Sequence, residues 1–274
     1  MKLQNVKIVF IDLDGTSLDY KRKLLSRKNL EIIEKWKQKG IKFVVSTGRG
    51  INAKTQKVLQ QLKSTGNVIA WNGSKILHNG LEVFSSPISF DTAKSIQELA
   101  KKHKISTIIN SDFRNKTYTN NFFLRIFLWF KRAKLNKISA LNIDYPVYKF
   151  IFFTSNKHKL NGFRQELEAI AGNQLNIVGA RHYSEFIEVT HKDSSKGQAE
   201  LTYASLDNID PSQCLHIGDT MNDASTVNKV KHVIAMKNST REFKKLATHI
   251  SPFSYKKGGL GKTLDYFLDN KDSK

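Results

Sequence analysis

The stretch Val6-Lys-Ile-Val-Phe-Ile-Asp-Leu-Asp-Gly-Thr16 decides the fold of this chain. Its first part is a nearly continuous apolar run, which is typical of a strand buried on both faces of a parallel sheet. The run ends in two carboxylates, Asp12 and Asp14, followed by a glycine that permits a tight turn. Because open α/β sheets bind ligands at the carboxyl ends of their strands, these carboxylates are candidates for a functional site.

A helix and a second strand follow this first strand. Apolar residues recur at helical spacing between Ser26 and Lys39, and Gly40 is suited to a left-handed helix end. The apolar run 41–45 then predicts the second strand. Strand, helix and strand in close succession form a βαβ unit, so we expect an α/β fold.

The middle of the chain differs from its two ends. Asn79-Gly80 between short apolar runs predicts a β-hairpin. From there to about Val189, helical and strand patterns alternate without a motif that can be tied to chemistry, and the βα rhythm returns at 214–219. We therefore predict a core domain formed by 1–82 and 190–274, with 83–189 inserted as a second domain.

Length and composition limit the class of protein. The chain has 274 residues, of which 39% are hydrophobic and 25% charged, enough for a folded protein of two domains. Its single cysteine, Cys214, excludes an internal disulfide framework and indicates a reducing, cytoplasmic compartment. No run of eighteen apolar residues occurs, and Met1–Val6 lacks the apolar region of a signal peptide. We expect no stable membrane association.

The net charge of +21 has two explanations. It could neutralise the phosphates of a nucleic acid or an anionic membrane. Alternatively it reflects composition, because the 36 lysines far outnumber the 9 arginines and are spread along the whole chain. We favour composition and expect no nucleic-acid partner, although the charge should raise encounter rates with phosphorylated metabolites.

One segment of the middle part is unusually apolar. Phe122–Phe130 is apolar at eight of nine positions, and Lys131, Arg132 and Lys134 follow it. It is too short to span a bilayer. We expect a half-buried helix that lines the inner face of the second domain; a substrate-contacting or membrane-surface helix is the alternative.

Three further polar segments could join Asp12 and Asp14. Ser46-Thr-Gly-Arg49 follows the second strand, where a hydroxyl and backbone N–H groups could hold phosphate. Lys196-Gly197 and Gly218-Asp-Thr-Met-Asn-Asp223 come later in the chain. Asp219 is placed to complete a metal site with Asp12. Each segment is weak evidence alone.

The later polar segment contains two further candidates. Asn222 could donate to phosphate or, with Asp223, support the metal ligands from behind. His216 and Cys214 lie within the preceding apolar strand, and we expect both to be structural.

These four segments, in this order, resemble the motifs of the haloacid dehalogenase-like phosphatases, and Asn72-Gly73, Glu188-Val-Thr190 and Ala235-Met236 are similar to the Cof-type subfamily. The resemblance covers most of the chain. It implies a Rossmann-like, doubly wound core with a mainly parallel sheet and a separate, inserted α/β cap domain. It also implies a phosphoric monoester hydrolase that uses Mg²⁺ and a small phosphorylated substrate, with a sugar phosphate favoured.

The resemblance implies a role for each matching position. Asp12 would be the nucleophile and a metal ligand, Asp14 the acid/base and a second ligand through its carbonyl, and Asp219 the third ligand. Asp223 would support them from the second shell. The remaining matches would hold the transferring phosphoryl group, namely Leu13, Thr47, Gly48, Lys196 and Asn222.

Two departures and two alternatives remain. Lys237 stands where the family often has Gly, and Ser17 stands where Leu is common, which we expect to be a minor change. The role of Arg49 is open between substrate and fold. The motifs also allow a phosphotransferase or mutase, while a basic nucleic-acid-binding protein that keeps the fold would not need Asp12, Asp14, Lys196 and Asp219 together.

Overall fold

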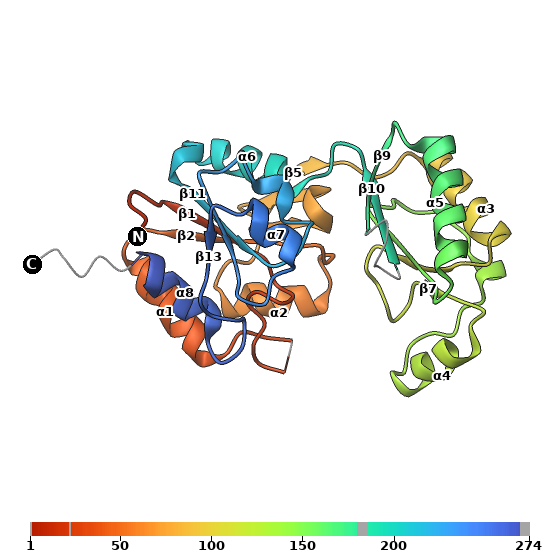
Figure 1. Cartoon of the computed structure of the whole chain (residues 1–274), viewed down its shortest axis with the longest axis horizontal. Helices are drawn as coiled ribbons and strands as arrows, with labels where there is room; N and C mark the ends of the chain where they lie inside the picture. Colours follow the sequence, from red (N-terminus) through yellow and green to blue (C-terminus); the bar gives the residue numbers. More distant parts are fainter. Residues whose placement is uncertain (1, 22, 180–185, 269–274) are drawn as a thin grey trace, which may run out of the picture. The chain divides into compact units, whose positions relative to one another are not determined.

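The structure, a computed structural model, describes residues 2–21, 23–179 and 186–268. The chain forms two compact units (Figure 1). The first comprises Met1–Phe84 and Ser195–Lys274, and the second comprises Ser85–Ser194. The boundaries expected from the sequence, 1–82 and 190–274 for the core and 83–189 for the insertion, stay a prediction.

Among the described residues, the first unit is built on an eight-stranded sheet with the order β13-β12-β11-β1-β2-β3-β4-β5. Neighbouring strands from β13 to β3 run parallel, and β4 joins β3 in antiparallel orientation. The strands are β1 (Ile8–Ile11), β2 (Lys42–Ser46), β3 (Val68–Ala70), β4 (Lys75–His78), β5 (Leu81–Ser85), β11 (Cys214–Gly218), β12 (His232–Ala235) and β13 (His249–Ile250).

Helices cover both faces of this sheet. On one face Val9 of β1 shares a buried cluster with Ile33 of α1, and on the other Phe10 meets Tyr203 of α6 edge to face, with ring centroids 6.0 Å apart. The predicted doubly wound, mainly parallel core is confirmed. The helices are α1 (Arg27–Gln38), α2 (Ala53–Gln61) and α8 (Gly259–Leu268) on the first face, and α6 (Lys196–Leu206) and α7 (Arg241–Leu246) on the second.

Local signals in the sequence account for the ends of several elements. Ser26 caps α1 by accepting the backbone N–H of Asn29, and Gly40 follows the helix with a φ of +84°. Asn79 and Gly80 both have positive φ, as a two-residue hairpin turn between β4 and β5 requires. The predicted helix and hairpin are therefore confirmed.

The second unit has a five-stranded sheet, among its described residues, with the order β7-β6-β8-β10-β9. All of its neighbouring strands pair in antiparallel orientation. Helices α3 and α5 pack together over a core that includes Ile96, Phe152 and Phe163. The elements are α3 (Phe90–Lys102), β6 (Ser106–Ile109), β7 (Thr117–Tyr118), α4 (Phe122–Phe130), β8 (Phe150–Phe153), α5 (Lys157–Ala171), β9 (Leu175–Val178) and β10 (Phe186–His191).

The prediction of a half-buried helix at Phe122–Phe130 is wrong in its burial. The segment does form a helix, α4, which Asn121 caps by accepting the backbone N–H of Leu124. However, of its nine side chains, all of them described, Leu128 alone is buried. Periodicity could not show this, because eight apolar residues in nine leave no polar face to mark the solvent side.

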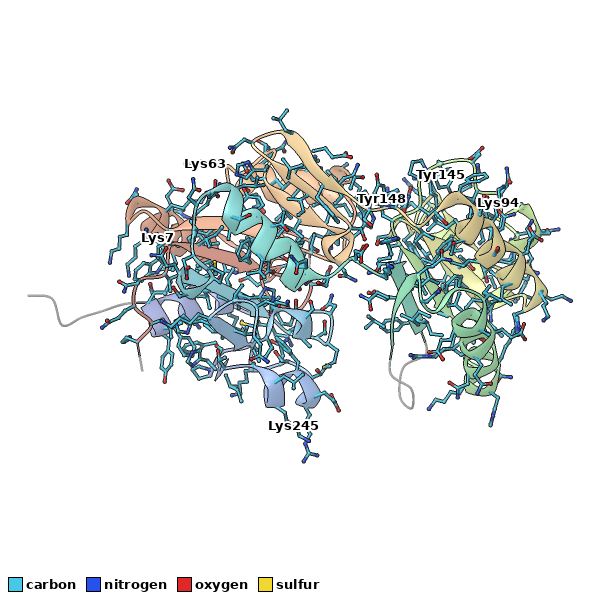
Figure 2. All side chains as sticks on the ribbon, turned by 90° about the horizontal axis from the view of Figure 1, so that it is seen from above. Lys7, Lys63, Lys94, Tyr145, Tyr148 and Lys245 are labelled. Carbon is cyan, nitrogen blue, oxygen red and sulfur yellow. The ribbon has the colours of Figure 1, made fainter. Side chains whose placement is uncertain are left out.

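The surface carries the positive charge in a dispersed form. Figure 2 shows Lys7, Lys63 and Lys245 on the outside of the first unit, and all three are exposed. Along the described part of the chain, no helix is both long and apolar enough to cross a membrane.

Candidate active site

The central strands of the first unit bring three of the polar segments to one edge of the sheet. β1 lies between β2 and β11 and runs parallel to both, so the carboxyl ends of these strands meet at the same edge. Asp12 follows β1, Thr47 follows β2, and Asp219 follows β11. Lys196, the first residue of α6, joins them through its side chain.

Lys196 is the centre of this arrangement. Its side chain is fully buried, and its Nζ lies 2.6 Å from an Oδ1 of both Asp12 and Asp223. Burial by itself lowers the pKa of a lysine, but the two carboxylates outweigh this effect and raise the pKa of Lys196 above its ordinary value. Lys196 is therefore a fixed positive charge.

The carboxylates of Asp12, Asp219 and Asp223 form a buried acidic cluster. One oxygen from each lies within 4.8 Å of the other two. Burial, followed by repulsion from its neighbours, raises the pKa of Asp219 to about 8. The same burial raises the pKa of Asp12 to about 6, although Lys196 opposes it. A cation would relieve this repulsion, and clustered carboxylate oxygens are the donors that hard divalent cations prefer, so the residues fit such an ion.

Asp223 supports the cluster through both of its oxygens. Oδ1 accepts from Lys196 and lies 3.1 Å from His216 Nε2, while Oδ2 accepts the backbone N–H groups of Asp219 and Thr220 at 2.9 and 3.0 Å. Burial tends to raise its pKa, but Lys196 and His216 lower it below the ordinary value. With these contacts occupied, Asp12 and Asp219 are the better candidates for metal ligands.

Behind Asp223 lies a pair of residues whose role the sequence did not reveal. His216 Nδ1 is 2.8 Å from Glu200 Oε1, and both side chains are completely buried. Burial lowers the pKa of His216, but Glu200 and Asp223 reverse the effect and raise it to about 9. His216 is thus part of the charged network and not simply packing. The one available signal was a histidine between Leu215 and Ile217 in an otherwise apolar strand.

Two glycines allow the acidic groups to approach closely. Gly15 has a φ of +77°, and a Cβ there would collide with the Asp219 carboxylate. A Cβ on Gly218 would likewise collide with the carboxylate of Asp223. The glycine in each motif is therefore explained by the space that a neighbouring carboxylate occupies.

Asp14 lies apart from the buried cluster. Its side chain is 62% exposed and pairs with the guanidinium of Arg49, with Nε 2.6 Å from Asp14 Oδ2 and Nη2 bonded to Oδ1. The carboxylate of Asp14 is thus beside the site rather than among the three clustered groups. Arg49, whose role the sequence left open, is its partner.

Two of the predicted phosphate-binding residues, Thr47 and Asn222, are linked through Asn72. The carbonyl of Thr47 accepts the backbone N–H of Asn72, and the amide of Asn222 donates to Asn72 Oδ1 over 3.3 Å. Asn72 adopts a φ of +58°, which asparagine tolerates better than most residues. Gly48 lies next to Thr47 in the loop after β2. Asn72 is a further residue of this site.

The loop after β1 is held in part by Ser17, which we expected to be a minor change. Ser17 is fully buried, and its hydroxyl donates to the carbonyl of Asp12 over 2.7 Å. The carbonyl of Leu13 accepts the backbone N–H of Ser17, while Asn238 donates to the carbonyl of Gly15 over 2.8 Å. Ser17 therefore fixes the backbone that carries Asp12.

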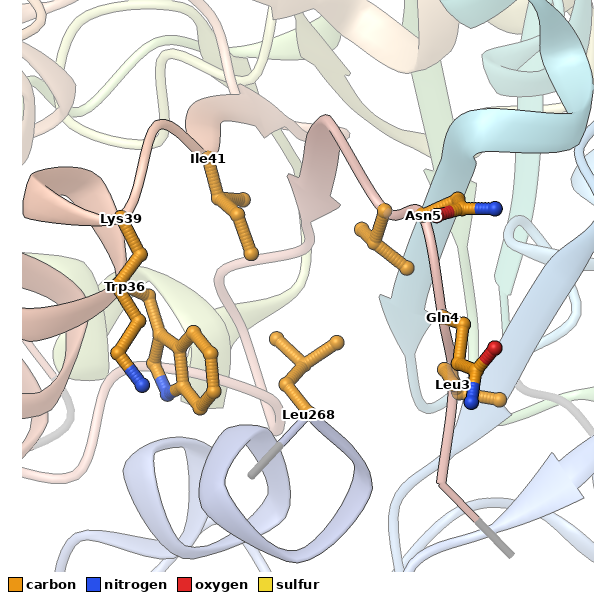
Figure 3. A pocket seen from close by; sticks show the side chains of 8 residues that line it. Leu3, Gln4, Asn5, Trp36, Lys39, Ile41 and Leu268 are labelled. Atoms are coloured by element: carbon orange, nitrogen blue, oxygen red, sulfur yellow. The ribbon is translucent and has the colours of Figure 1, made fainter. Parts of the chain in front are cut away.

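A separate pocket lies at the opposite edge of the sheet. It has a volume of about 350 Å³ and is lined by side chains that include Leu3, Trp36, Lys39 and Leu268 (Figure 3). Leu3 precedes β1, so this pocket is at the amino ends of the strands. It holds none of the clustered carboxylates and does not belong to the site described above.

Comparisons with known proteins identify the family and the fold of this chain. A model of the haloacid dehalogenase-like hydrolase family matches residues 9–264. The chain is 25% identical to 5-amino-6-(5-phospho-D-ribitylamino)uracil phosphatase YwtE of Bacillus subtilis, over 96% of this chain and 97% of that protein. The solved structure of a haloacid dehalogenase-like hydrolase from B. subtilis is 22% identical, covers 96% of this chain and 100% of its own, and has a TM-score of 0.77.

A second solved structure is that of the subclass IIB sugar phosphatase BT4131. It is 20% identical, covers 95% of this chain and 98% of its own, and has a TM-score of 0.75. Its fold and the family match agree with the core and the inserted α/β cap that the motifs predicted. This chain belongs to the haloacid dehalogenase-like hydrolase family and is a phosphatase of that family.

Proposed function

We propose that this phosphatase hydrolyses a small sugar phosphate or sugar-alcohol phosphate through an aspartyl-phosphate on Asp12, with Mg²⁺ as its cation. The observation that carries the proposal is the position of Lys196, fully buried and within 2.6 Å of Asp12. A buried, fixed cation beside a candidate nucleophile is suited to stabilising negative charge that develops on phosphoryl oxygens.

In the first step, a carboxylate oxygen of Asp12 attacks phosphorus. Because Oδ1 accepts a hydrogen bond from Lys196, we assign the attack to Oδ2. The new O–P bond forms as the bond to the leaving alkoxide breaks, and the leaving oxygen takes a proton from Asp14. Asp14 pairs with Arg49 as a carboxylate, so before it can donate this proton the incoming phosphate must displace it from that guanidinium, and the released carboxylate takes up a proton from solvent.

In the second step, water attacks the same phosphorus. Asp14 takes a proton from the water, the bond between phosphorus and Asp12 breaks, and inorganic phosphate leaves. Lys196, the hydroxyl of Thr47, the amide of Asn222 and backbone N–H groups near Leu13 and Gly48 would hold the phosphoryl oxygens throughout. Transfer to an acceptor other than water would give the phosphotransferase alternative.

Asp12 and Asp219 would hold the metal ion, with the carbonyl of Asp14 as a further ligand. A bound Mg²⁺ would supply positive charge that balances the carboxylates and the substrate phosphate. Asp223 would keep the backbone of Asp219 in place through the hydrogen bond that it accepts from the Asp219 N–H.

Two similar proteins support the choice of substrate. The name of YwtE gives it a phosphorylated ribityl chain as substrate, and BT4131 is described as a sugar phosphatase. Both kinds of compound carry a phosphate on a polyhydroxylated carbon chain. We therefore propose the same chemical class for this chain.

The test measures phosphate release from p-nitrophenyl phosphate and from a panel of sugar phosphates, with Mg²⁺ and with EDTA. We expect Asp12→Asn to lower the rate by about 10³-fold or more while the protein stays folded, because the amide cannot act as the nucleophile. Asp91→Asn, which changes an exposed carboxylate on α3, is the matched control and should keep its activity. Near-normal turnover of Asp12→Asn, or activity unchanged by EDTA, would contradict the proposal.

A further inference from the structure

Helix α4 of the second unit exposes an apolar surface. Phe123 is 79% exposed, Phe130 is 71% and Trp129 is 64%. Phe122, Ile126 and Phe127 are also exposed, so six of the nine side chains of the helix present large apolar groups to solvent. Contiguous apolar surface of this kind marks an interaction site on a soluble protein.

The helix is held in a defined position on the second unit. Leu128 is fully buried, and Phe127 meets Phe113 edge to face with ring centroids 6.1 Å apart. The end of the helix is fixed as well, because the backbone N–H of Lys134 donates to the carbonyl of Arg114. The exposed side chains thus belong to an ordered helix anchored by its opposite face.

The sequence around α4, between Asp112 and Asp144, is basic. The segment 113–143 contains seven lysine or arginine residues and no aspartate or glutamate. Lys131, Arg132, Lys134 and Lys137 are exposed, and Lys131 Nζ lies 5.3 Å from the centre of the Phe127 ring. Aromatic side chains therefore lie directly beside a local excess of positive charge.

We infer that the exposed face of α4 docks on an anionic lipid surface. Short helices that combine exposed Phe, Trp and Ile with flanking Lys and Arg lie in the plane of the membrane interface, where the rings enter the headgroup region and the cations meet anionic lipids. The expectation of no stable membrane association rested on the lack of a spanning segment, which a peripheral contact does not need.

Two other occupants fit the observations less well. A second copy of this chain, docked through the same face, would bring two basic segments together, and like charges would oppose the contact. A nucleic acid would use aromatic rings as open stacking platforms. Here Phe122 packs edge to face on Phe123, and Trp129 packs edge to face on Phe130, so these rings are paired with each other instead.

The experiment measures co-sedimentation of the full chain with sucrose-loaded vesicles. One set contains about one-third phosphatidylglycerol in phosphatidylcholine, and the other contains phosphatidylcholine alone. We expect binding to the anionic set that falls by at least tenfold in the double variant Phe123→Ser/Phe130→Ser. The matched control is Phe90→Ser/Ile170→Ser, which changes two exposed apolar residues elsewhere on the second unit and should bind normally.

A second readout locates the contact. Trp129 is the single tryptophan of the second unit's sequence, so its fluorescence should shift to the blue on anionic vesicles and be quenched by brominated lipids. Trp129→Phe should abolish that change. The triple variant Lys131→Gln/Arg132→Gln/Lys134→Gln should weaken binding to anionic vesicles at low salt.

Three results would overturn the inference. The first is no binding to anionic vesicles by folded wild-type protein. The second is equal binding by wild type and Phe123→Ser/Phe130→Ser. The third is a dimer in sedimentation velocity, or a complex with single-stranded RNA, that the double variant abolishes while vesicles bind neither protein. Circular dichroism and thermal unfolding of each variant establish that it is folded.

Discussion

Two regions of the molecule reverse the usual pattern of apolar side chains inside and charged side chains outside. They are the strand ends of the first unit and helix α4 of the second. The first region buries charged side chains, among them Lys196, Asp12 and Asp223. The second exposes large apolar side chains, such as Phe123 and Trp129. In the first region the buried Lys196 is paired with two carboxylates of the chain, those of Asp12 and Asp223. On α4 no comparable compensation exists among the described residues.

This difference separates two kinds of functional surface. Burying a charge is costly, so it persists only where pairing and hydrogen bonds offset the cost inside the molecule. Exposing an aromatic ring costs less, and the cost is removed only when something outside the molecule covers the ring. Buried, paired charges indicate a preorganised reaction site. Exposed aromatic rings indicate a surface that binds a partner outside the chain.

The largest effect in this comparison should come from Lys196→Met. Removing the cation leaves two buried carboxylates without their main partner, and we expect a loss of about 3–5 kcal/mol in the free energy of unfolding. Urea denaturation measures it. Lys63→Met, in a 75% exposed ion pair, is the control and should change stability by less than about 0.5 kcal/mol. An equal loss of unfolding free energy in Lys196→Met and Lys63→Met would contradict the prediction that the buried lysine contributes more to stability than the exposed one.

The next effect concerns the pair behind Asp223. His216→Val leaves Glu200 buried without its partner and should cost about 2–3 kcal/mol. In the double variant His216→Val/Glu200→Leu both polar groups are gone, so we expect much of that loss to be recovered. Urea denaturation of the two single variants and the double variant completes the cycle. If the losses of unfolding free energy in the two single variants simply added up in the double variant, the coupling that we assign to this pair would be contradicted.

A smaller effect should appear as the pH falls. Burial, and then the nearby His249, lower the pKa of His232 from 6.5 to about 4. Between pH 4 and pH 6.5 the unfolded chain binds more protons than the folded chain. The contribution of His232 to the free energy of unfolding is therefore fully present above pH 6.5 and declines as the pH approaches 4. We expect His232 to contribute about 1–2 kcal/mol to this decline. His232→Gln should flatten the curve of unfolding free energy against pH, and an unaltered slope would argue against the assignment.

The smallest effect should be that of Phe123→Ser/Phe130→Ser on stability. Both rings are mostly exposed, so their removal should change the free energy of unfolding by less than about 0.5 kcal/mol. Phe163→Ala, which empties a buried position in the same unit, should cost about 3–5 kcal/mol. A large loss in the double variant would mean that α4 is a structural part of the core.

Much of the fold was predictable because local chemistry and global packing agree. The apolar run before Asp12 becomes the central strand β1, Ser26 caps α1, and Asn79-Gly80 forms the turn. The burial of α4 was not predictable in this way. A helix with apolar residues on every side gives no periodic signal, and only its position in the tertiary structure shows what covers it.

For the site, strand-end position and the resemblance to a family grouped the polar segments, but neither gave the contacts between their side chains. The contact of Lys196 with Asp12 agrees with the grouping of those motifs. The network through His216 and Glu200 was missed because a lone histidine in an apolar strand is usually structural. Partners 16 residues apart are visible as a pair only once α6 packs beside β11.

The placement of β1 in the middle of the sheet has a consequence for protein synthesis. β1 is made before its neighbour β11, and the lysine that binds Asp12 lies 184 residues further along the chain. At about 5–20 residues per second, β1 waits on the order of ten to forty seconds for these partners. Throughout that interval an apolar strand edge is open to pairing with other chains, so we expect the nascent protein to depend on chaperones more than its finished sheet suggests.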